Sequence, residues 1–199
     1  MSNLVVKPGD GSFTYADYCT WENEGESDTR WELIDGRAYA MAAPTLAHQD
    51  ILGNLFLRFK VFLHGKTCKV YVAPCDVRLN HDKGDDTVVQ PDLLVVCDPA
   101  KLADGKSVKG APDLVIEILS PSTLRHDKKI KLKKYIQAGV KEVWFVDIDD
   151  RGIDVVLPGG NEPYAMYTCD ERISVGILPE LSIDLNDIFE PVSEQQEVK

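Results

Sequence analysis

Positive charge is scarce in this sequence. Among 199 residues, 22 Lys and Arg stand against 33 Asp and Glu, which gives a formal net charge of −11 at pH 7. Proteins that bind nucleic acid through its phosphates need Lys and Arg to neutralise them. The composition therefore argues against a general polyanion binder, and any nucleic-acid role requires a local basic surface.

Long apolar runs, a signal sequence and paired cysteines are also missing. No apolar stretch approaches the roughly 18 residues of a membrane span, and the N-terminus MSNLVVKPGD has no cleavage-site pattern. These absences predict a soluble, cytoplasmic protein without membrane contact. No Cys-x-x-Cys pair occurs, so we expect buried free thiols rather than zinc sites or disulfides. The five cysteines are Cys19, Cys68, Cys75, Cys97 and Cys169.

The chain is long enough for one well-cored domain. Its residues are 44% hydrophobic and 28% charged, with no shift in composition and no internal repeat along the chain. We predict a single domain over residues 1–190, followed by a polar C-terminal tail at 191–199.

The order of predicted elements indicates an α/β fold. WELIDGRAYAMAA predicts a hairpin around Asp35-Gly36, and apolar spacing predicts a helix from Thr45 to about Leu63 that ends at Gly65. A basic helix from about Leu124 to Ala138 is expected to end at Gly139. Together these predict a mixed β-sheet with a helix on each face. The predicted strands are KVYVAPCDVRL, VVQPDLLVVCD with Pro91 at an edge or strand start, APDLVIEILSPST, KEVWFVDID, GIDVVLPG, EPYAMYTC, ISVGIL and LPELSIDLNDIF.

Glu117 is the residue that this fold does not explain. It interrupts the apolar run LVIEIL, where a lone charge costs several kcal/mol unless it is paired, protonated or bound to a metal. Side chains alternate along a strand, so Asp92 in the preceding strand is its expected neighbour. A divalent cation between the two carboxylates would favour ionisation of both, and oxygen ligands suit Mg²⁺ or Mn²⁺. The alternative is a structural ion pair between Glu117 and Lys131 or Arg125.

Three segments carry a family resemblance. QPDLLVV, APDLVIEILSPST and HDKKIKLKKYIQAGVKEVWFVD are similar to the Uma-two family of restriction endonucleases, a branch of the PD-(D/E)XK nuclease superfamily. The resemblance extends from WELIDG to LSIDLNDIF. It implies the restriction-endonuclease-like fold, with a central mixed β-sheet flanked by helices and an N-terminal β-hairpin. It also implies a Mg²⁺-dependent or Mn²⁺-dependent DNA endonuclease that hydrolyses phosphodiester bonds.

The resemblance assigns roles to individual residues. Asp92 matches the aspartate of the PD motif and Glu117 the acidic residue of the next strand, so these carboxylates and the Ile118 carbonyl would hold the metal. Leu119 stands where the superfamily pattern places lysine. Lys131 is the replacement candidate, with Lys128 as an alternate, since the family pattern D-x-x-x-K-x-x-x-Y matches Asp127, Lys131 and Tyr135.

Further residues are expected near this site. Glu32 and His48 also match family positions, and Glu32 is a candidate third carboxylate around the metal. His48 is alternatively a hydrogen-bonded histidine at a helix start, and Tyr135 alternatively a packing residue with a hydrogen-bonded hydroxyl. We expect Lys131 at an exposed helix position. The basic helix predicts a DNA-binding surface, or alternatively a solvated face that balances charge. Its members are Arg125, Lys128, Lys129, Lys133 and Lys134.

Three classes of function remain open at this point. The first is the metal-dependent endonuclease, and the second is a catalytically weak or inactive module of the same fold that binds nucleic acid or a protein partner. The third is an accessory subunit whose partner supplies affinity for DNA. A homodimer is expected for double-strand cutting, which needs two sites, but no residue identifies its interface.

Overall fold

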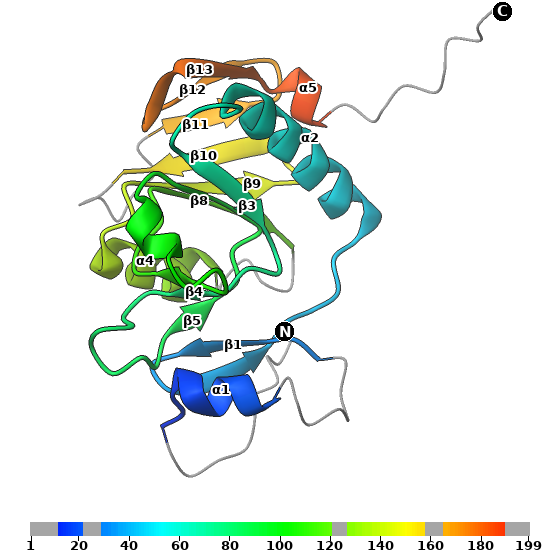
Figure 1. Ribbon diagram of the computed structural model, residues 1–199. Coiled ribbons are helices and arrows are strands. Elements are labelled where there is room, and N and C mark those ends of the chain that lie inside the picture. The colour runs from blue at the N-terminus through cyan, green and yellow to red at the C-terminus, as the bar shows by residue number, and fades with distance from the viewer. Residues whose placement is uncertain (1–11, 22–28, 121–126, 158–164, 190–199) are drawn as a thin grey trace, which may run out of the picture.

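The computed structural model describes residues 12–21, 29–120, 127–157 and 165–189 (Figure 1). Its main layer is a mixed sheet with the strand order β11-β10-β9-β8-β6-β3, in which β8 and β9 are parallel and the other neighbours antiparallel. No helix in the described ranges is long and apolar enough to cross a bilayer. The strands are β3 (Lys69–Val72), β6 (Leu93–Val96), β8 (Leu114–Leu119), β9 (Glu142–Asp147), β10 (Gly152–Val156) and β11 (Ala165–Thr168).

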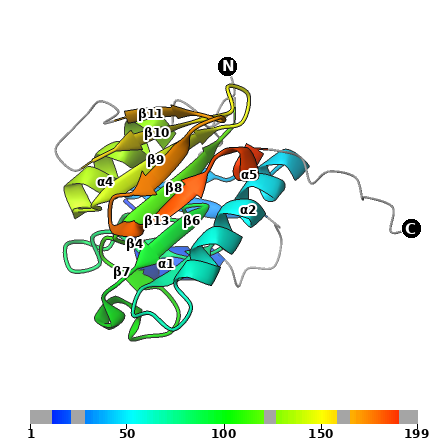
Figure 2. The ribbon, with the colours of Figure 1, turned by 90° about the horizontal axis from the view of Figure 1, so that it is seen from above.

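A helix covers each face of this sheet, as the sequence predicts (Figure 2). Helix α2 (Leu46–Phe62) begins after Thr45, whose side chain accepts the His48 N–H, and it packs on the face that carries Ile116 and Trp144. The opposite face, with Val115, is covered by a π-helical turn η2 (Asp127–Lys131) and helix α4 (Leu132–Ala138). Alternating side chains of β6 and β8 therefore enter two separate cores.

A smaller sheet lies beside the α4 face. Its strand order is β2-β1-β5-β4-β7, and helix α1 (Tyr15–Trp21) packs against it through Tyr18. The predicted hairpin is confirmed, because Asp35 and Gly36 both adopt positive φ (50° and 71°), as a two-residue type I′ turn requires. The strands are β1 (Trp31–Ile34), β2 (Arg37–Ala40), β4 (Val77–Arg78), β5 (Val88–Val89) and β7 (Val108–Lys109).

Two predicted strands are each divided between the two sheets. KVYVAPCDVRL forms β3 in the large sheet and β4 in the small one, and VVQPDLLVVCD forms β5 and β6 in the same way. Each division contains a proline, Pro74 or Pro91, which cannot donate to a strand ladder. Pro91 stands just before β6, which confirms its expected place at a strand start. The continuity that the sequence predicts is wrong because both chain segments change sheets.

The C-terminal strands form a separate unit. Strands β12 (Arg172–Val175) and β13 (Leu178–Asp184) pair only with each other in the described residues, rather than extending the large sheet as predicted, and helix α5 (Asn186–Phe189) follows. Apolar residues of this hairpin join the core on the α2 face. The predicted basic helix ends at Gly139, which has a φ of 92°. Its start near Leu124 and the polar tail 191–199 lie outside the described residues.

One cysteine pair contradicts the expectation of free thiols. Cys68 and Cys97 form a disulfide, whereas Cys19, Cys75 and Cys169 are free. The antiparallel register of β3 and β6 pairs Lys69 with Val96, so the two cysteines stand opposite each other one position further along. The pairing is not visible in the sequence because 29 residues separate the two cysteines.

A buried carboxylate connects the C-terminal hairpin to the large sheet. Glu142, at the start of β9, is 1% exposed. It accepts hydrogen bonds from Trp144 Nε1 at 2.8 Å, from the Gly176 N–H at 3.1 Å and from the Ile177 N–H at 2.9 Å. A Cβ on Gly176 would lie 2.9 Å from a Glu142 oxygen, so a larger residue at this position would displace the Glu142 carboxylate from its donors.

Replacing Glu142 should destabilise the fold without touching the candidate site described below. Glu142→Ala leaves three donors without their acceptor, and we expect it to lower the free energy of unfolding by about 2–4 kcal/mol. Urea denaturation measures this change. Glu180→Ala on β13 is the matched control, because the Glu180 side chain is 81% exposed. It should change stability by less than about 0.5 kcal/mol, and equal effects of the two variants would contradict the anchoring role.

Candidate functional site

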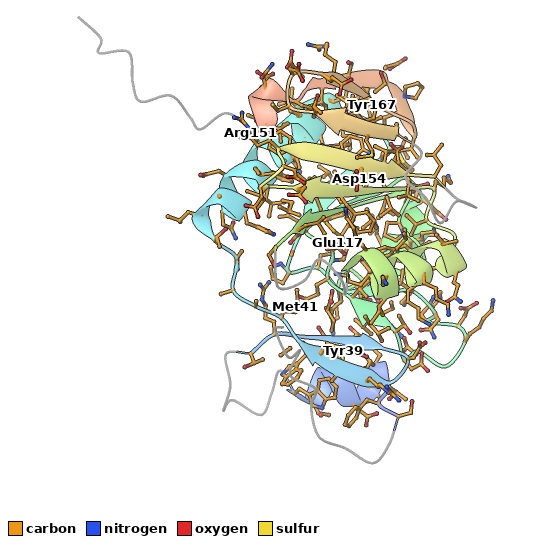
Figure 3. All side chains as sticks on the ribbon, turned by 180° about the vertical axis from the view of Figure 1, so that it is seen from behind. Tyr39, Met41, Glu117, Arg151, Asp154 and Tyr167 are labelled. Atoms are coloured by element: carbon orange, nitrogen blue, oxygen red, sulfur yellow. A yellow bond between two sulfur atoms is a disulfide. The ribbon has the colours of Figure 1, made fainter. Side chains whose placement is uncertain are left out.

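Lys131 compensates the buried charge of Glu117. Figure 3 labels Glu117 on the large sheet. Its ammonium nitrogen lies 2.6 Å from Glu117 Oε1 and 2.9 Å from Glu32 Oε1. The side chains of Lys131, Glu32 and Glu117 are only 3%, 6% and 5% exposed. One ammonium group therefore joins two carboxylates that come from different sheets. The expectation that Lys131 occupies an exposed helix position is wrong, because η2 lies on the sheet face that carries Glu117.

Tyr135 completes the environment of Glu117 from the same side. It follows Lys131 by one helical turn, is fully buried, and donates its hydroxyl hydrogen to Glu117 Oε1. Burial raises the pKa of the Tyr135 hydroxyl well above its usual value, and the nearby charge of Glu117 adds to this effect. Tyr135 is therefore a neutral hydrogen-bond donor throughout the physiological pH range.

Glu32 is fixed by the small sheet. Its Oε1 also accepts the Gln90 backbone N–H at 2.8 Å. The Gln90 side-chain nitrogen in turn lies 2.9 Å from both the Tyr18 hydroxyl and Asp76 Oδ1. The orientation of Glu32 thus depends on β5 and α1 as well as on its own strand. Sequence reasoning missed Gln90 and Tyr18, and the one available signal is the position of Gln90 directly before the Pro-Asp motif.

Asp92 lies beside Glu117, but its carboxylate has other partners. The register pairs Leu93 with Ile116, so Asp92, which precedes β6, falls next to Glu117 on the neighbouring strand. Asp92 Oδ2 accepts the Ile118 N–H at 2.7 Å, and Oδ1 lies 3.2 Å from His48 Nε2. His48 stands in the first turn of α2, where its buried Nδ1 has no hydrogen-bond partner in the described part of the chain.

Acidic groups outnumber basic ones among the described side chains of this cluster. Three carboxylates, Glu32, Asp92 and Glu117, and one ammonium group, that of Lys131, give these four side chains a formal charge of −2. Within residues 12–21, 29–120, 127–157 and 165–189, no group of three or more His, Cys, Asp or Glu is arranged to hold a metal ion. Mg²⁺ needs less than this, because it commonly binds one or two carboxylates and keeps several waters.

The predicted DNA-binding residues are only partly available for phosphates. Lys128 pairs with Asp154 at 2.7 Å, and Lys134 pairs with Asp35 at 2.5 Å. Lys129 and Lys133 are exposed, one helical turn apart. Arg125 lies outside the described residues, and the structure does not describe the Asp127 side chain.

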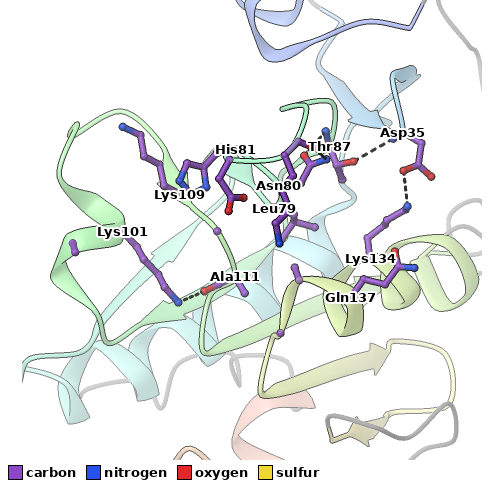
Figure 4. Close-up of a pocket in the computed structure, with 16 residues that line it drawn as sticks. Asp35, Leu79, Asn80, His81, Thr87, Lys101, Lys109, Ala111, Lys134 and Gln137 are labelled. Carbon is purple, nitrogen blue, oxygen red and sulfur yellow. Dashed lines mark hydrogen bonds and ion pairs between the residues drawn. The ribbon is translucent and has the colours of Figure 1, made fainter.

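A pocket of about 610 Å³ lies apart from this cluster (Figure 4). It is lined by the hairpin turn, the end of α4 and two loops. The lining includes none of the clustered side chains Glu32, His48, Asp92, Glu117, Lys131 and Tyr135. Several of its basic groups are already engaged: Lys134 with Asp35, Lys109 with Asp104 at 3.2 Å, and Lys101 with the Ala111 carbonyl at 2.6 Å. Of the four lining lysines, Lys83 is the one whose ammonium group has no partner among the described residues.

Removing the Lys131 ammonium should destabilise the protein strongly. Lys131→Met leaves Glu32 and Glu117 buried and facing each other, and losing one member of a buried ion pair costs about 3–5 kcal/mol. We expect this loss in urea denaturation at pH 7.

Lys134→Met is the matched control for this substitution. It removes an ammonium from the same helix whose partner, Asp35, is 65% exposed. Exposed ion pairs contribute about 1 kcal/mol at most, so the control should remain nearly as stable as the parent protein. Similar losses of stability in both variants would show that the buried cluster stabilises the fold no more than an exposed ion pair does.

Comparisons with known proteins agree with this architecture. An uncharacterized protein of Synechocystis sp. is 31% identical over 121 residues, which are 60% of this chain and 60% of that protein. The crystal structure of "a putative nuclease belonging to DUF820" from Anabaena variabilis matches with a TM-score of 0.70 at 18% identity, covering 89% of this chain and 97% of the other, so the two share a fold. The model of the Uma2 family, "Putative restriction endonuclease", matches residues 15–186. This match covers most of the chain and confirms the resemblance seen in its motifs, so the chain belongs to the Uma2 family.

Proposed function

We propose that the protein is a Mg²⁺-dependent or Mn²⁺-dependent endonuclease that hydrolyses phosphodiester bonds in DNA. One observation carries the proposal. Leu119 occupies the superfamily lysine position and is buried, yet an ammonium group still reaches the Glu117 carboxylate, from Lys131 on a different element. Packing of an apolar core does not require an ammonium group beside Glu117, whereas phosphodiester hydrolysis requires a cation close to the carboxylates.

The donor set suits a hard divalent cation. Asp92 and Glu117 occupy adjacent strands, and Ile118 lies against Asp92 through its N–H, so these carboxylates and the Ile118 carbonyl are the candidate ligands. The excess of carboxylates over ammonium groups among the described side chains favours a divalent cation. When bound, Mg²⁺ would neutralise charge on the phosphate and activate water for attack.

The chain's own residues prepare the surroundings of that chemistry. The Lys131 ammonium can orient the attacking water or stabilise negative charge that develops on the phosphate, without competing for a metal as a ligand. Tyr135 and the Gln90 N–H hold the Glu117 and Glu32 carboxylates in fixed orientations. His48 holds the Asp92 carboxylate in the same way, so the acidic groups are oriented before a substrate arrives.

DNA contact is proposed for a narrow surface. Lys129 and Lys133 are exposed on neighbouring turns, while Lys128 and Lys134 are occupied by carboxylates. With a net charge of −11, the rest of the chain repels a polyanion. We therefore expect weak, salt-sensitive binding to DNA by the isolated chain.

A second function is favoured by the same Leu119. If the apolar residue marks a lost catalytic position, the Lys131 ion pair is structural and the protein is a nuclease-fold module that binds nucleic acid or a protein partner. Lys131 and Tyr135 both use Glu117 Oε1, which leaves that oxygen little capacity for a metal. The two functions differ in whether Asp92 matters for anything except stability.

The chain offers a matched pair of aspartates for this test. Asp92 and Asp113 both follow a proline, and each accepts a backbone N–H of the neighbouring strand at 2.7 Å, from Ile118 and Cys97 respectively. The two contacts lie at opposite ends of the β6–β8 pairing, because these strands are antiparallel. Asp113 is bound by Lys141 at 2.7 Å. Burial raises the pKa of Asp113, but the bonds from Lys141 and Cys97 outweigh burial and hold that pKa below its ordinary value.

Asp92→Asn should abolish activity, and Asp113→Asn should not. We expect the first variant to lose Mg²⁺-dependent nicking of supercoiled plasmid by about a hundredfold or more, since asparagine keeps the hydrogen bond but removes the charge. The second variant should nick DNA at nearly the parental rate. If both variants retain activity, Asp92 is not a metal ligand, and if the parent protein nicks DNA with neither Mg²⁺ nor Mn²⁺, the binding-module function replaces this proposal.

Metal binding can be measured without any substrate. Calorimetric titration of the parent protein with Mn²⁺ should reveal a site that weakens sharply in Glu117→Gln, because an amide is a far poorer ligand than a carboxylate. Glu142→Gln is the control, since it alters an equally buried carboxylate on the adjacent strand. Unchanged Mn²⁺ affinity in Glu117→Gln would contradict the proposed coordination.

A further inference from the structure

Exposed apolar side chains gather on the outer surface of α2. Among the described residues, Leu46, Leu57 and Val61 are 85%, 55% and 68% exposed, and they account for half of the six large hydrophobic residues in solvent. Their spacing along the helix places them on one face, opposite the side that packs on the sheet. Single exposed apolar residues are ordinary, but a set on one helix face indicates a contact surface.

Gly53 lies on the same face, and the space around it is open. A Cβ built at this position meets no atom within 4 Å, so alanine would fit without any rearrangement. Glycine inside a helix costs about 1 kcal/mol relative to alanine. Gly53 therefore destabilises the helix, and the contacts around it in the folded monomer do not require a glycine. At a contact between two helices, a missing side chain leaves room for a large residue of the partner.

Two copies of this helix face are complementary when the two helices run in opposite directions. Asp50 and Lys60 stand five residues on either side of Leu55, and Gly53 and Leu57 stand two residues on either side. Two copies of α2 packed antiparallel about a twofold axis at Leu55 would place Leu57 of each copy over Gly53 of the other. The same arrangement would place each Asp50 beside the Lys60 of the other copy. These four positions follow one another at intervals of three, four and three residues, the spacing of a helix-packing stripe.

The charged members of this stripe are available for such pairing. Asp50 and Lys60 are both exposed, and neither has an ion pair with any residue that the structure describes. The Lys60 ammonium lies 5.8 Å from the centre of the Phe56 ring, which keeps it along the helix. A partner of a different sequence would not require charged and apolar positions to stand symmetrically about Leu55. This symmetry therefore favours a second copy of this chain as the partner.

We propose that the outer face of α2, formed by Leu46, Asp50, Gly53, Leu57, Lys60 and Val61, is the interface of a symmetric homodimer in which the two α2 helices pack antiparallel. The interface does not depend on the proposed nuclease chemistry. It would give an assembly with two copies of the candidate site, which cutting both strands of a duplex requires. A single helix pair of about 25 Å buries little area, so the dimer should dissociate in the micromolar range.

The first test is sedimentation velocity of the full chain from about 1 to 300 μM, a range that spans micromolar affinity. The parent protein should shift from monomer to dimer across this range. Leu57→Glu should weaken association by about a hundredfold or more, because it places a charge at each of the two central contacts. Met166→Glu is the control, since Met166 is 73% exposed on the edge strand β11. It should leave association unchanged.

The second test exchanges the charges of the stripe. Asp50→Lys and Lys60→Asp should each weaken self-association by about tenfold, since each creates two like-charge contacts. An equimolar mixture of the two variants should associate again, and so should the double variant Asp50→Lys/Lys60→Asp. All positions are exposed, and circular dichroism verifies that the variants remain folded.

Three outcomes would overturn the proposal. A parent protein that stays monomeric at 300 μM would leave the stripe to a partner of another sequence. A dimer that Met166→Glu disrupts would form through the β11 edge instead. A dimer that is insensitive to Leu57→Glu and to the charge exchange would use a different surface. If the parent protein dimerises but nicks no DNA, the proposed function fails and the proposed interface stands.

Discussion

The structure depends on how one negative charge is accommodated inside an apolar strand. Glu117 lies near the middle of β8, in a sheet covered on both faces, and a carboxylate there is costly without a close positive partner. Lys131 supplies that partner, and Tyr135 adds a hydrogen bond from the same helical segment. Glu32 joins through the same ammonium group. The packing of η2 on the large sheet and the position of the small sheet are thus both tied to a single buried nitrogen atom.

Local sequence signals predict those parts of the molecule whose cause is local. The Asp35-Gly36 turn is specified by two residues that tolerate positive φ, and α2 by a capping threonine and apolar spacing. Alternation along β8 correctly separates Val115 and Glu117 from Ile116 and Ile118. In each of these cases the deciding interactions occur within a few residues of chain.

The sequence predicts the contacts of Glu117 with distant segments, namely its position beside Asp92 and, as the alternative, its ion pair with Lys131. Three other features that depend on distant segments were not predicted. The sequence gives no sign that the chain changes sheets at Pro74 and before Pro91, because both segments have ordinary strand composition. The Cys68–Cys97 disulfide follows from the same long-range register. The burial of Lys131 was missed for a related reason. A lysine in a basic helix has the composition of a solvated face, and only the carboxylates on two other strands determine that this one points inward.

The excursion of the chain between β3 and β6 has a consequence for access to the site. These two strands are neighbours in the large sheet, so β4 and β5 form an appendage that leaves and re-enters the sheet without interrupting it. Such an appendage can open as a cooperative unit at a lower free energy than global unfolding. Gln90 follows β5 directly and donates its N–H to Glu32 of β1, which pairs with β5. An opening of the small sheet would therefore withdraw the Glu32 carboxylate from Lys131 and admit solvent beside Glu117. Such an opening would give water and ions a route to the side chains of Glu32, Glu117 and Lys131, which are otherwise buried.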